Sequence, residues 1–203
     1  MVDYSKIIQA NSGHWSKCEI TPSRLREVME VAARLVEEDA KFRYQAVETA
    51  TGVRWYAVAV IHEREASQSW KTQLGQGDPL HEVSRNVPRG RGPFLDHDGD
   101  GPGHDAWHRS ALDALIDCPP FASRWKDWTP GGTLTLLELY NGIGYELYHH
   151  ESSPYVWAST TQQQRGKYTG DGDYDASAWD NQLGCAAMLK GMIQLDKSIV
   201  FDE

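Results

Sequence analysis

The chain has 203 residues, of which 40% are apolar, and its formal net charge is −9. This length predicts a single domain, and the negative charge argues against nucleic acid as a partner. No run of about 18 apolar residues is present, so no membrane-spanning helix is expected, and the first residues lack the apolar core of a Sec signal. The three cysteines, Cys18, Cys118 and Cys185, lie far apart. They predict buried thiols in a reducing compartment rather than a disulfide framework.

The first half of the chain predicts two helices followed by a long irregular segment. A helix is expected to start near Thr21-Pro22-Ser23 and to continue to about Gln45, because apolar residues recur at helical spacing. After a break near Thr51-Gly52, a second helix is expected from about Val53 to Glu65. It is apolar on nearly every side and should therefore be central. Glycine, proline and charge then dominate from Gln68 to about His104, which predicts a functional or mobile loop.

The second half predicts further helices, and no role could be assigned to residues 1–20. The expected helices are Ala106–Cys118, Phe121–Trp128, Leu134–Tyr148 and Ala178–Leu195, with a second loop at Ser152–Tyr174. The predicted fold class is therefore all-α, as one domain over residues 1–203 with two long loops.

Two glutamates stand at the end of the predicted central helix. Glu63 and Glu65 are two residues apart, about 200° around a helix, so only one of them can face a cleft. A carboxyl at the end of a buried apolar helix is expected to have a raised pKa and can then donate a proton near neutral pH. The alternative is a solvated charged pair at a helix end.

The residues around this pair resemble a known enzyme superfamily. The segment Ile61-His-Glu-Arg-Glu-Ala-Ser67 is similar to the end of the catalytic helix in goose-type lysozymes and soluble lytic transglycosylases. The later segment Leu139-Tyr-Asn-Gly-Ile-Gly-Tyr145 resembles the Ala-Tyr-Asn-Ala-Gly motif of the same lysozyme-like superfamily. The resemblance covers roughly residues 50 to 195. It departs from the superfamily pattern where Ala66 replaces a serine and where Gly77-Asp78-Pro79-Leu80 stands in place of Gly-Leu-Met-Gln.

The resemblance implies a lysozyme-like helical fold and a muramidase activity, which would cleave the β-1,4 bond between N-acetylmuramic acid and N-acetylglucosamine in peptidoglycan. Glu65 would be the general acid. Asp78 is the first candidate for the base of a hydrolase, followed by Asp96, Asp98 and Glu82. Gly-Asp-Pro is also ordinary turn chemistry, so a structural role for Asp78 stays open.

The resemblance also implies how the substrate would be held. Tyr140 and Asn141 would hold the site and the acetamido group of the sugar. Aromatic rings near this motif, if they are not core residues, are candidate walls for a glycan strand. They are Tyr145, Tyr148, Tyr155 and Trp157.

Two other functions remain open from the sequence, one catalytic and one not. A lytic transglycosylase on the same fold would give 1,6-anhydro products and would need no second carboxylate. A non-catalytic, calcium-stabilised cell-wall-binding module would keep the fold without the chemistry.

No cofactor is required by the proposed chemistry, but one loop has the pattern of a metal site. Asp96, Asp98 and Asp100, followed by Gly101, match the first half of a calcium-binding loop, while the twelfth position is Trp107 rather than glutamate. A solvated acidic loop is the alternative. His104 and His108 have the spacing of zinc ligands but lack the glutamate of His-Glu-x-x-His.

The expected partner is the glycan strand of peptidoglycan, and we expect a monomer with no membrane partner. The lack of a signal peptide fits a phage endolysin, which accumulates in the host cytoplasm and reaches the wall through a holin lesion. An injected antibacterial effector or a domesticated prophage product fits equally well.

Overall fold

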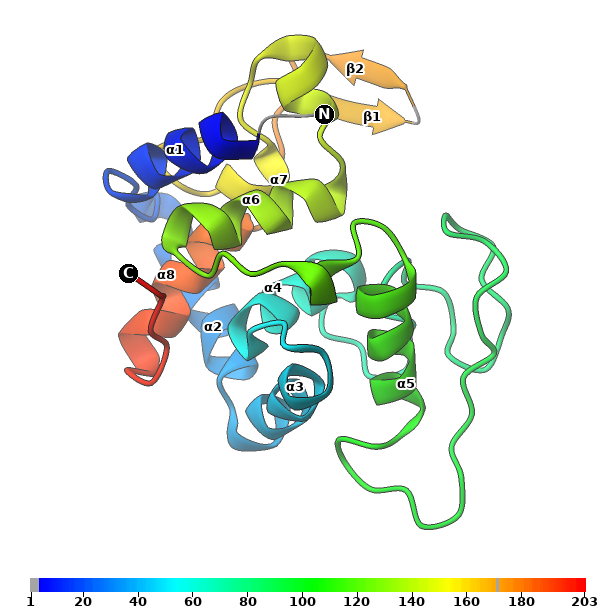
Figure 1. Ribbon diagram of the computed structural model, residues 1–203. Helices are drawn as coiled ribbons and strands as arrows, with labels where there is room; N and C mark the ends of the chain where they lie inside the picture. Colours follow the sequence, from blue (N-terminus) through cyan, green and yellow to red (C-terminus); the bar gives the residue numbers. More distant parts are fainter. Residues whose placement is uncertain (1–3, 171) are drawn as a thin grey trace. The chain divides into compact units, whose positions relative to one another are not determined.

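The computed structural model describes residues 4–170 and 172–203 (Figure 1). These residues are mostly helical and include one two-stranded antiparallel sheet, which confirms a predominantly helical fold and adds a hairpin that was not predicted. None of the helices in these ranges is long and apolar enough to cross a membrane. The chain divides into two compact units, one formed by residues up to 33 together with 127–203 and the other by residues 34–126.

The first unit is built from both ends of the chain. Its elements are α1 (Tyr4–Trp15), the 3₁₀ turn η1 (Pro22–Arg24), α2 (Leu25–Leu35, which ends just past the unit boundary), α6 (Pro130–Asn141), the π-helical turn η4 (Tyr145–His149), α7 (Pro154–Trp157), β1 (Lys167–Gly170), β2 (Asp173–Asp175) and α8 (Cys185–Leu195). The strands pair with Tyr168 opposite Tyr174.

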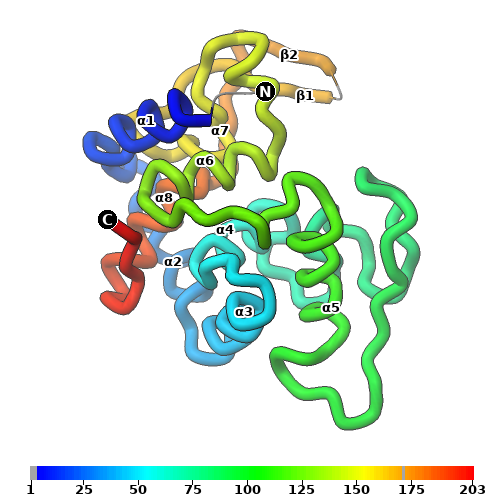
Figure 2. The backbone as a smooth tube through the Cα atoms, in the orientation of Figure 1, coloured from blue at the N-terminus to red at the C-terminus, as the bar shows by residue number. Residues whose placement is uncertain are grey.

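Helices α1 and α6 lie side by side in this unit (Figure 2). They approach closely at Gly131, where an added Cβ would collide with the Oγ of Ser12 and with the carbonyl oxygen of Ile8. Asn11 of α1 is buried and donates to Thr135 and Glu138 of α6. The N-terminal segment, for which the sequence suggested no role, therefore forms part of this unit's core.

The second unit surrounds a buried helix. Its elements are α3 (Glu38–Thr51), α4 (Trp55–Ala66), α5 (Ala106–Leu112), the π-helical turn η2 (Asp113–Asp117) and the 3₁₀ turn η3 (Ala122–Arg124). Residues 67–105 form no helix and only an isolated bridge between Thr72 and Pro79, as the glycine-rich composition predicted.

Several predicted boundaries were wrong, for local reasons. The helix expected to run from Thr21 to about Gln45 breaks after Leu35, because Glu37 caps α3 by accepting from the Ala40 N–H at 3.3 Å. The helix expected over Leu134–Tyr148 ends at Asn141, where Gly142 adopts a φ of 102°. The last helix starts at Cys185 rather than at Ala178.

We predict that Gly131→Ala lowers the free energy of unfolding by about 1–3 kcal/mol, because the added methyl forces α1 and α6 apart. Gly13→Ala on α1 is the matched control. No atom lies within 4 Å of the methyl it would add, so alanine should raise the free energy of unfolding by about 0.5–1 kcal/mol through its helix propensity. Urea denaturation of the three proteins measures both changes. Equal midpoints for wild type and Gly131→Ala would contradict the close packing of these helices.

Candidate active site

The C-terminal end of α4 carries the two glutamates. Every residue of α4 from Trp55 to His62 is buried, whereas Glu63, Arg64 and Glu65 are only half-buried. The last turn is therefore the part of this helix where a carboxyl can meet both an apolar interior and a substrate.

The chain reverses sharply after this turn. Ser67 and Gln68 have φ values of 49° and 57°, in the left-handed region that residues with a Cβ avoid. Their N–H groups donate to the carbonyl oxygens of Glu63 at 2.9 Å and His62 at 3.2 Å. Such conformations cost about 1–3 kcal/mol each and cluster at functional sites. Two consecutive ones directly after the last turn of α4 mark this reversal as a candidate site.

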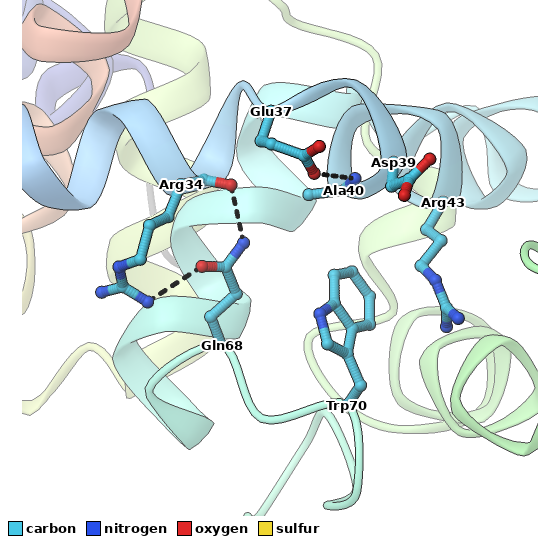
Figure 3. Close-up of a pocket in the computed structure, with 7 residues that line it drawn as sticks. All are labelled: Arg34, Glu37, Asp39, Ala40, Arg43, Gln68 and Trp70. Atoms are coloured by element: carbon cyan, nitrogen blue, oxygen red, sulfur yellow. Dashed lines mark hydrogen bonds between the residues drawn. The ribbon is translucent and has the colours of Figure 1, made fainter.

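Glu63 forms an ion pair within this unit. Both of its carboxylate oxygens lie 3.4 Å from Nη2 of Arg34. The same arginine donates to Oε1 of Gln68, and Gln68 donates back to the Arg34 carbonyl oxygen, each at 3.0 Å (Figure 3). Glu63 thus helps to tie the end of α4 and the following turn to Arg34, and the acid assignment rests on Glu65, about 200° away around the helix.

A buried histidine supports the turn from inside. His62 has no exposed surface, and its Nδ1 lies 3.0 Å from the Tyr44 hydroxyl. Its Nε2 lies 3.0 Å from the Ser69 carbonyl oxygen and 3.1 Å from Nε1 of Trp107. The indole N–H of Trp107 can only donate, so it needs a lone pair on Nε2, whereas the Ser69 carbonyl oxygen needs a proton there. A neutral imidazole satisfies one of these two contacts at a time, and Nδ1 then takes the opposite role toward the Tyr44 hydroxyl. Burial lowers the pKa of His62 to about 4, so the ring is neutral at physiological pH.

The loop that contains Asp78 lies against the end of α4. Gly77 has a φ of 68°, and a Cβ built on it would come 3.1 Å from the carbonyl oxygen of Glu65. The backbone of the residue before the candidate base therefore passes so close to the backbone of the candidate acid that a side chain on Gly77 would crowd it. This contact links the segments that carry the two predicted catalytic residues.

The Asp78 carboxylate organises its own loop. It is buried, and its Oδ2 accepts from the backbone N–H groups of Arg85 at 3.1 Å and Asn86 at 3.0 Å, while Oδ1 accepts from Nδ2 of Asn86 at 3.2 Å. Three of roughly four acceptor positions are thus used within the loop. Glu82, a weaker candidate base, is exposed and pairs with Arg85 at 3.0 Å.

The predicted calcium ligands have other contacts. Asp96 accepts from the Ala106 N–H at 2.8 Å, Asp98 is exposed, and Asp100 pairs with Arg109 at 2.7 Å. In the part of the chain that the structure describes, no group of three or more His, Cys, Asp or Glu side chains is arranged to hold a metal ion. Calcium binding stays a prediction.

Tyr140 and Asn141 end α6 in the first unit. Tyr140 is half-buried and Asn141 is exposed, and Nδ2 of Asn141 lies 3.5 Å from Oγ of Ser153. Both side chains can therefore be reached by a ligand at the end of this helix.

Tyr145 and Trp157 are core residues of the same unit. Trp157 has no exposed surface and stacks at a tilt on His14, with ring centroids 5.3 Å apart. Tyr145 is 5% exposed, and its hydroxyl accepts from the Tyr168 N–H at 3.1 Å. A buried ring offers no face for a sugar, and Tyr155, at 3% exposed, is excluded in the same way, so Tyr140, Asn141 and the exposed Tyr148 remain as candidates for substrate contact.

A buried acid in the first unit was missed at the sequence level. Glu138 is 3% exposed, and burial raises its pKa, although hydrogen bonds from Asn11 and from the Ser153 N–H act in the opposite direction. It is the one charged residue of α6. A lone acid in an otherwise uncharged helix that ends in the Tyr-Asn motif was a usable signal, because buried carboxylates are rare and need partners.

Two pockets open on the second unit. One, of about 430 Å³, is lined by Arg34, Glu37, Asp39, Ala40, Arg43, Gln68 and Trp70 (Figure 3). The other, of about 330 Å³, shares Arg43 and Trp70 and adds His81 and Asp96 among its lining residues. The Arg43 guanidinium lies over the Trp70 ring, 4.7 Å from its centroid. Glu65 and Asp78 line neither pocket.

Comparisons with protein-family models, with curated protein sequences and with solved structures found no match to this chain.

We predict that Asp78→Ala lowers the free energy of unfolding by about 1–3 kcal/mol, because it removes a buried carboxylate and its three hydrogen bonds from Arg85 and Asn86. Glu82→Ala removes an exposed ion pair from the same loop and should cost less than about 1 kcal/mol. Limited proteolysis should then cut residues 78–86 faster in Asp78→Ala than in Glu82→Ala. Equal rates would show that Asp78 does not hold the loop.

A second prediction concerns acid stability. The pKa of His62 is about 4 in the folded protein against an ordinary value of 6.5, so between these values the unfolded chain binds a proton that the folded protein does not. Stability is therefore lost as the pH falls through this window, by about 2–3 kcal/mol between about pH 7 and pH 4.5 from this group. Removing the imidazole in His62→Phe should reduce the pH dependence by that amount.

Urea denaturation of wild type and His62→Phe at about pH 7 and about pH 4.5 measures how far the free energy of unfolding falls between these pH values. An equal fall in the free energy of unfolding for His62→Phe and wild type would rule out a neutral, buried His62.

Proposed function

We propose that this protein is a lysozyme-like muramidase that cleaves the β-1,4 bond between N-acetylmuramic acid and N-acetylglucosamine in peptidoglycan, with Glu65 as the general acid. The observation that carries the proposal is the end of α4. Glu65 is a half-buried glutamate in the last turn of a buried helix. Two residues in the left-handed conformation, Ser67 and Gln68, follow it, and the loop at Gly77 passes close to its carbonyl oxygen.

The chemistry follows from this placement. The Glu65 carboxyl would give its proton to the glycosidic oxygen while the bond from that oxygen to the anomeric carbon breaks. In a hydrolase, a water would attack the anomeric carbon and lose its proton to a carboxylate base. A general acid must reach the leaving oxygen, and the last turn of α4, at the edge of a buried helix, leaves the Glu65 side chain partly exposed to a substrate.

Asp78 remains the first candidate for the base because its loop touches the end of α4. One acceptor position of its carboxylate stays available after the three hydrogen bonds from Arg85 and Asn86. That position would hold the attacking water and take its proton.

The same hydrogen bonds favour a second candidate function. A carboxylate that already holds a loop together is poorly suited to act as a base, and a lytic transglycosylase needs no second carboxylate. The 6-hydroxyl of the muramic acid attacks the anomeric carbon within the same sugar, and its proton would go to the Glu65 carboxylate, which has just given its own proton to the leaving oxygen. Such an enzyme would keep Glu65 as its acid and would release 1,6-anhydro ends.

Substrate contacts are proposed first for the Tyr-Asn motif, with the exposed ring of Tyr148 as a further candidate. Tyr140 and Asn141 are accessible at the end of α6, and an asparagine amide can both donate to and accept from an acetamido group. Their part in the site rests on the resemblance of this motif to that of the lysozyme-like superfamily.

We predict that Glu65→Gln slows the lysis of outer-membrane-stripped Gram-negative cells by about 10²–10⁴-fold, because the amide has the size of the acid but no proton to give. Glu63→Gln, two residues away, should lyse within a few-fold of wild type, since Glu63 pairs with Arg34. Turbidity loss measures the rates after circular dichroism has shown that all three proteins are folded.

Equal lysis by all three proteins would exclude Glu65 as the acid. No lysis by folded wild type, combined with retained binding to cell walls, would favour the non-catalytic binding module.

A further inference from the structure

The buried Glu138 carboxylate joins three segments of the first unit. Its Oε2 accepts from Nδ2 of Asn11 in α1 at 3.1 Å, and its Oε1 accepts from the backbone N–H of Ser153, just before α7, at 3.2 Å. Glu138 itself lies on α6, three residues before Asn141. One carboxylate thus fixes the segment around Ser153 against the end of the helix that carries the Tyr-Asn motif.

The chemistry of these contacts requires a carboxylate. The Thr135 hydroxyl donates to the carbonyl oxygen of Gly131 at 2.7 Å, so its oxygen can accept from Nδ2 of Asn11 at 3.1 Å. This contact fixes the orientation of the Asn11 amide, which presents an N–H to Glu138. Both groups that face Glu138 are therefore donors. A glutamine has one acceptor oxygen, so it could satisfy one of them and would turn its own N–H toward the other.

Ser153 extends this arrangement to Asn141. The backbone of Ser153 is held by Glu138, and its Oγ lies 3.5 Å from Nδ2 of Asn141. Ser153 has no exposed surface, whereas Asn141 is exposed. The buried acid is thus connected, through one residue, to a side chain that a ligand can reach.

We infer that Glu138 is a positioning residue, which sets the orientation of Asn141 for the sugar through Ser153; the inference rests on the proposed function. Glu138 is buried and does not touch the substrate. It acts by holding Ser153 where the serine hydroxyl restrains the Asn141 amide.

The test is the steady-state kinetics of cleavage of soluble, uncross-linked glycan strands. Glu138→Gln should raise KM about tenfold with kcat within about twofold of wild type, since it loosens a contact used for binding rather than for proton transfer. Asn141→Ala should raise KM by a similar factor. In the double variant the two increases should not multiply, because both changes remove the same contact.

Two further variants separate positioning from folding. Asn11→Asp combined with Glu138→Gln exchanges the acid and the amide between the two positions. The introduced glutamine can then use its oxygen for the Ser153 N–H and donate from its NH₂ group to the introduced aspartate. This double change should lower KM again.

Ser153→Ala keeps the backbone N–H that binds Glu138 and removes only the hydroxyl. It should raise KM even if Glu138→Gln does not fold. Leu134→Val, at a fully buried position on the same helix, is the control for general loosening and should leave KM unchanged.

The outcomes are distinct. A lower melting temperature with unchanged KM in Glu138→Gln, or unchanged KM in Ser153→Ala, would overturn the positioning role and leave the proposed function intact. Multiplying effects of Glu138→Gln and Asn141→Ala would also overturn it. Folded wild type that neither cleaves nor binds the strands would overturn the proposed function and this inference with it.

Discussion

The burial of α4 is the constraint on which the second unit depends. Because every side chain from Trp55 to His62 is buried, this helix can present charge only in its last turn, at Glu63–Glu65. The buried imidazole of His62 is accommodated by hydrogen-bonding partners on either side of its ring and by remaining neutral. A helix organised in this way places a carboxyl at the border between an apolar core and the surface.

The contacts around that last turn have one common effect, which is to hold the backbone at Glu65. Ser67 and Gln68 adopt left-handed conformations, and Gln68 is hydrogen-bonded to Arg34. The Asp78 carboxylate accepts hydrogen bonds within its loop, and the backbone of that loop passes close to the Glu65 carbonyl oxygen at Gly77. Backbone strain of this kind persists only where the surroundings enforce it. A reacting group benefits from such support because proton transfer needs a fixed geometry.

The sequence predicted what depends on local pattern. The apolar run of α4, the break at Gly52 and the irregular segment after Gln68 followed from periodicity and composition and were confirmed. Tertiary contacts could not be predicted from local pattern. Helix α1 is held by its close approach to α6 at Gly131, and the burial of Trp157, which ends α7, could not be inferred while its segment was expected to be a loop. For the candidate site, the pairing of Glu63 with Arg34 and the hydrogen bonds of Asp78 depend on residues brought together by folding. Glu138 was visible in the sequence as a lone acid in an apolar helix, but its partners Asn11 and Ser153 lie too far away along the chain to be inferred.

The central claim is that Glu65 protonates the bond between the two amino sugars, and analysis of the products tests it most directly. Purified sacculi would be incubated with wild type or with Glu65→Gln, and the soluble fragments would be reduced with borohydride and identified by mass spectrometry. The account predicts fragments with newly formed N-acetylmuramic acid ends from wild type and almost none from Glu65→Gln, with 1,6-anhydro ends identifying a transglycosylase instead of a hydrolase. Identical fragments from both proteins, or cleavage in the stem peptide, would contradict it.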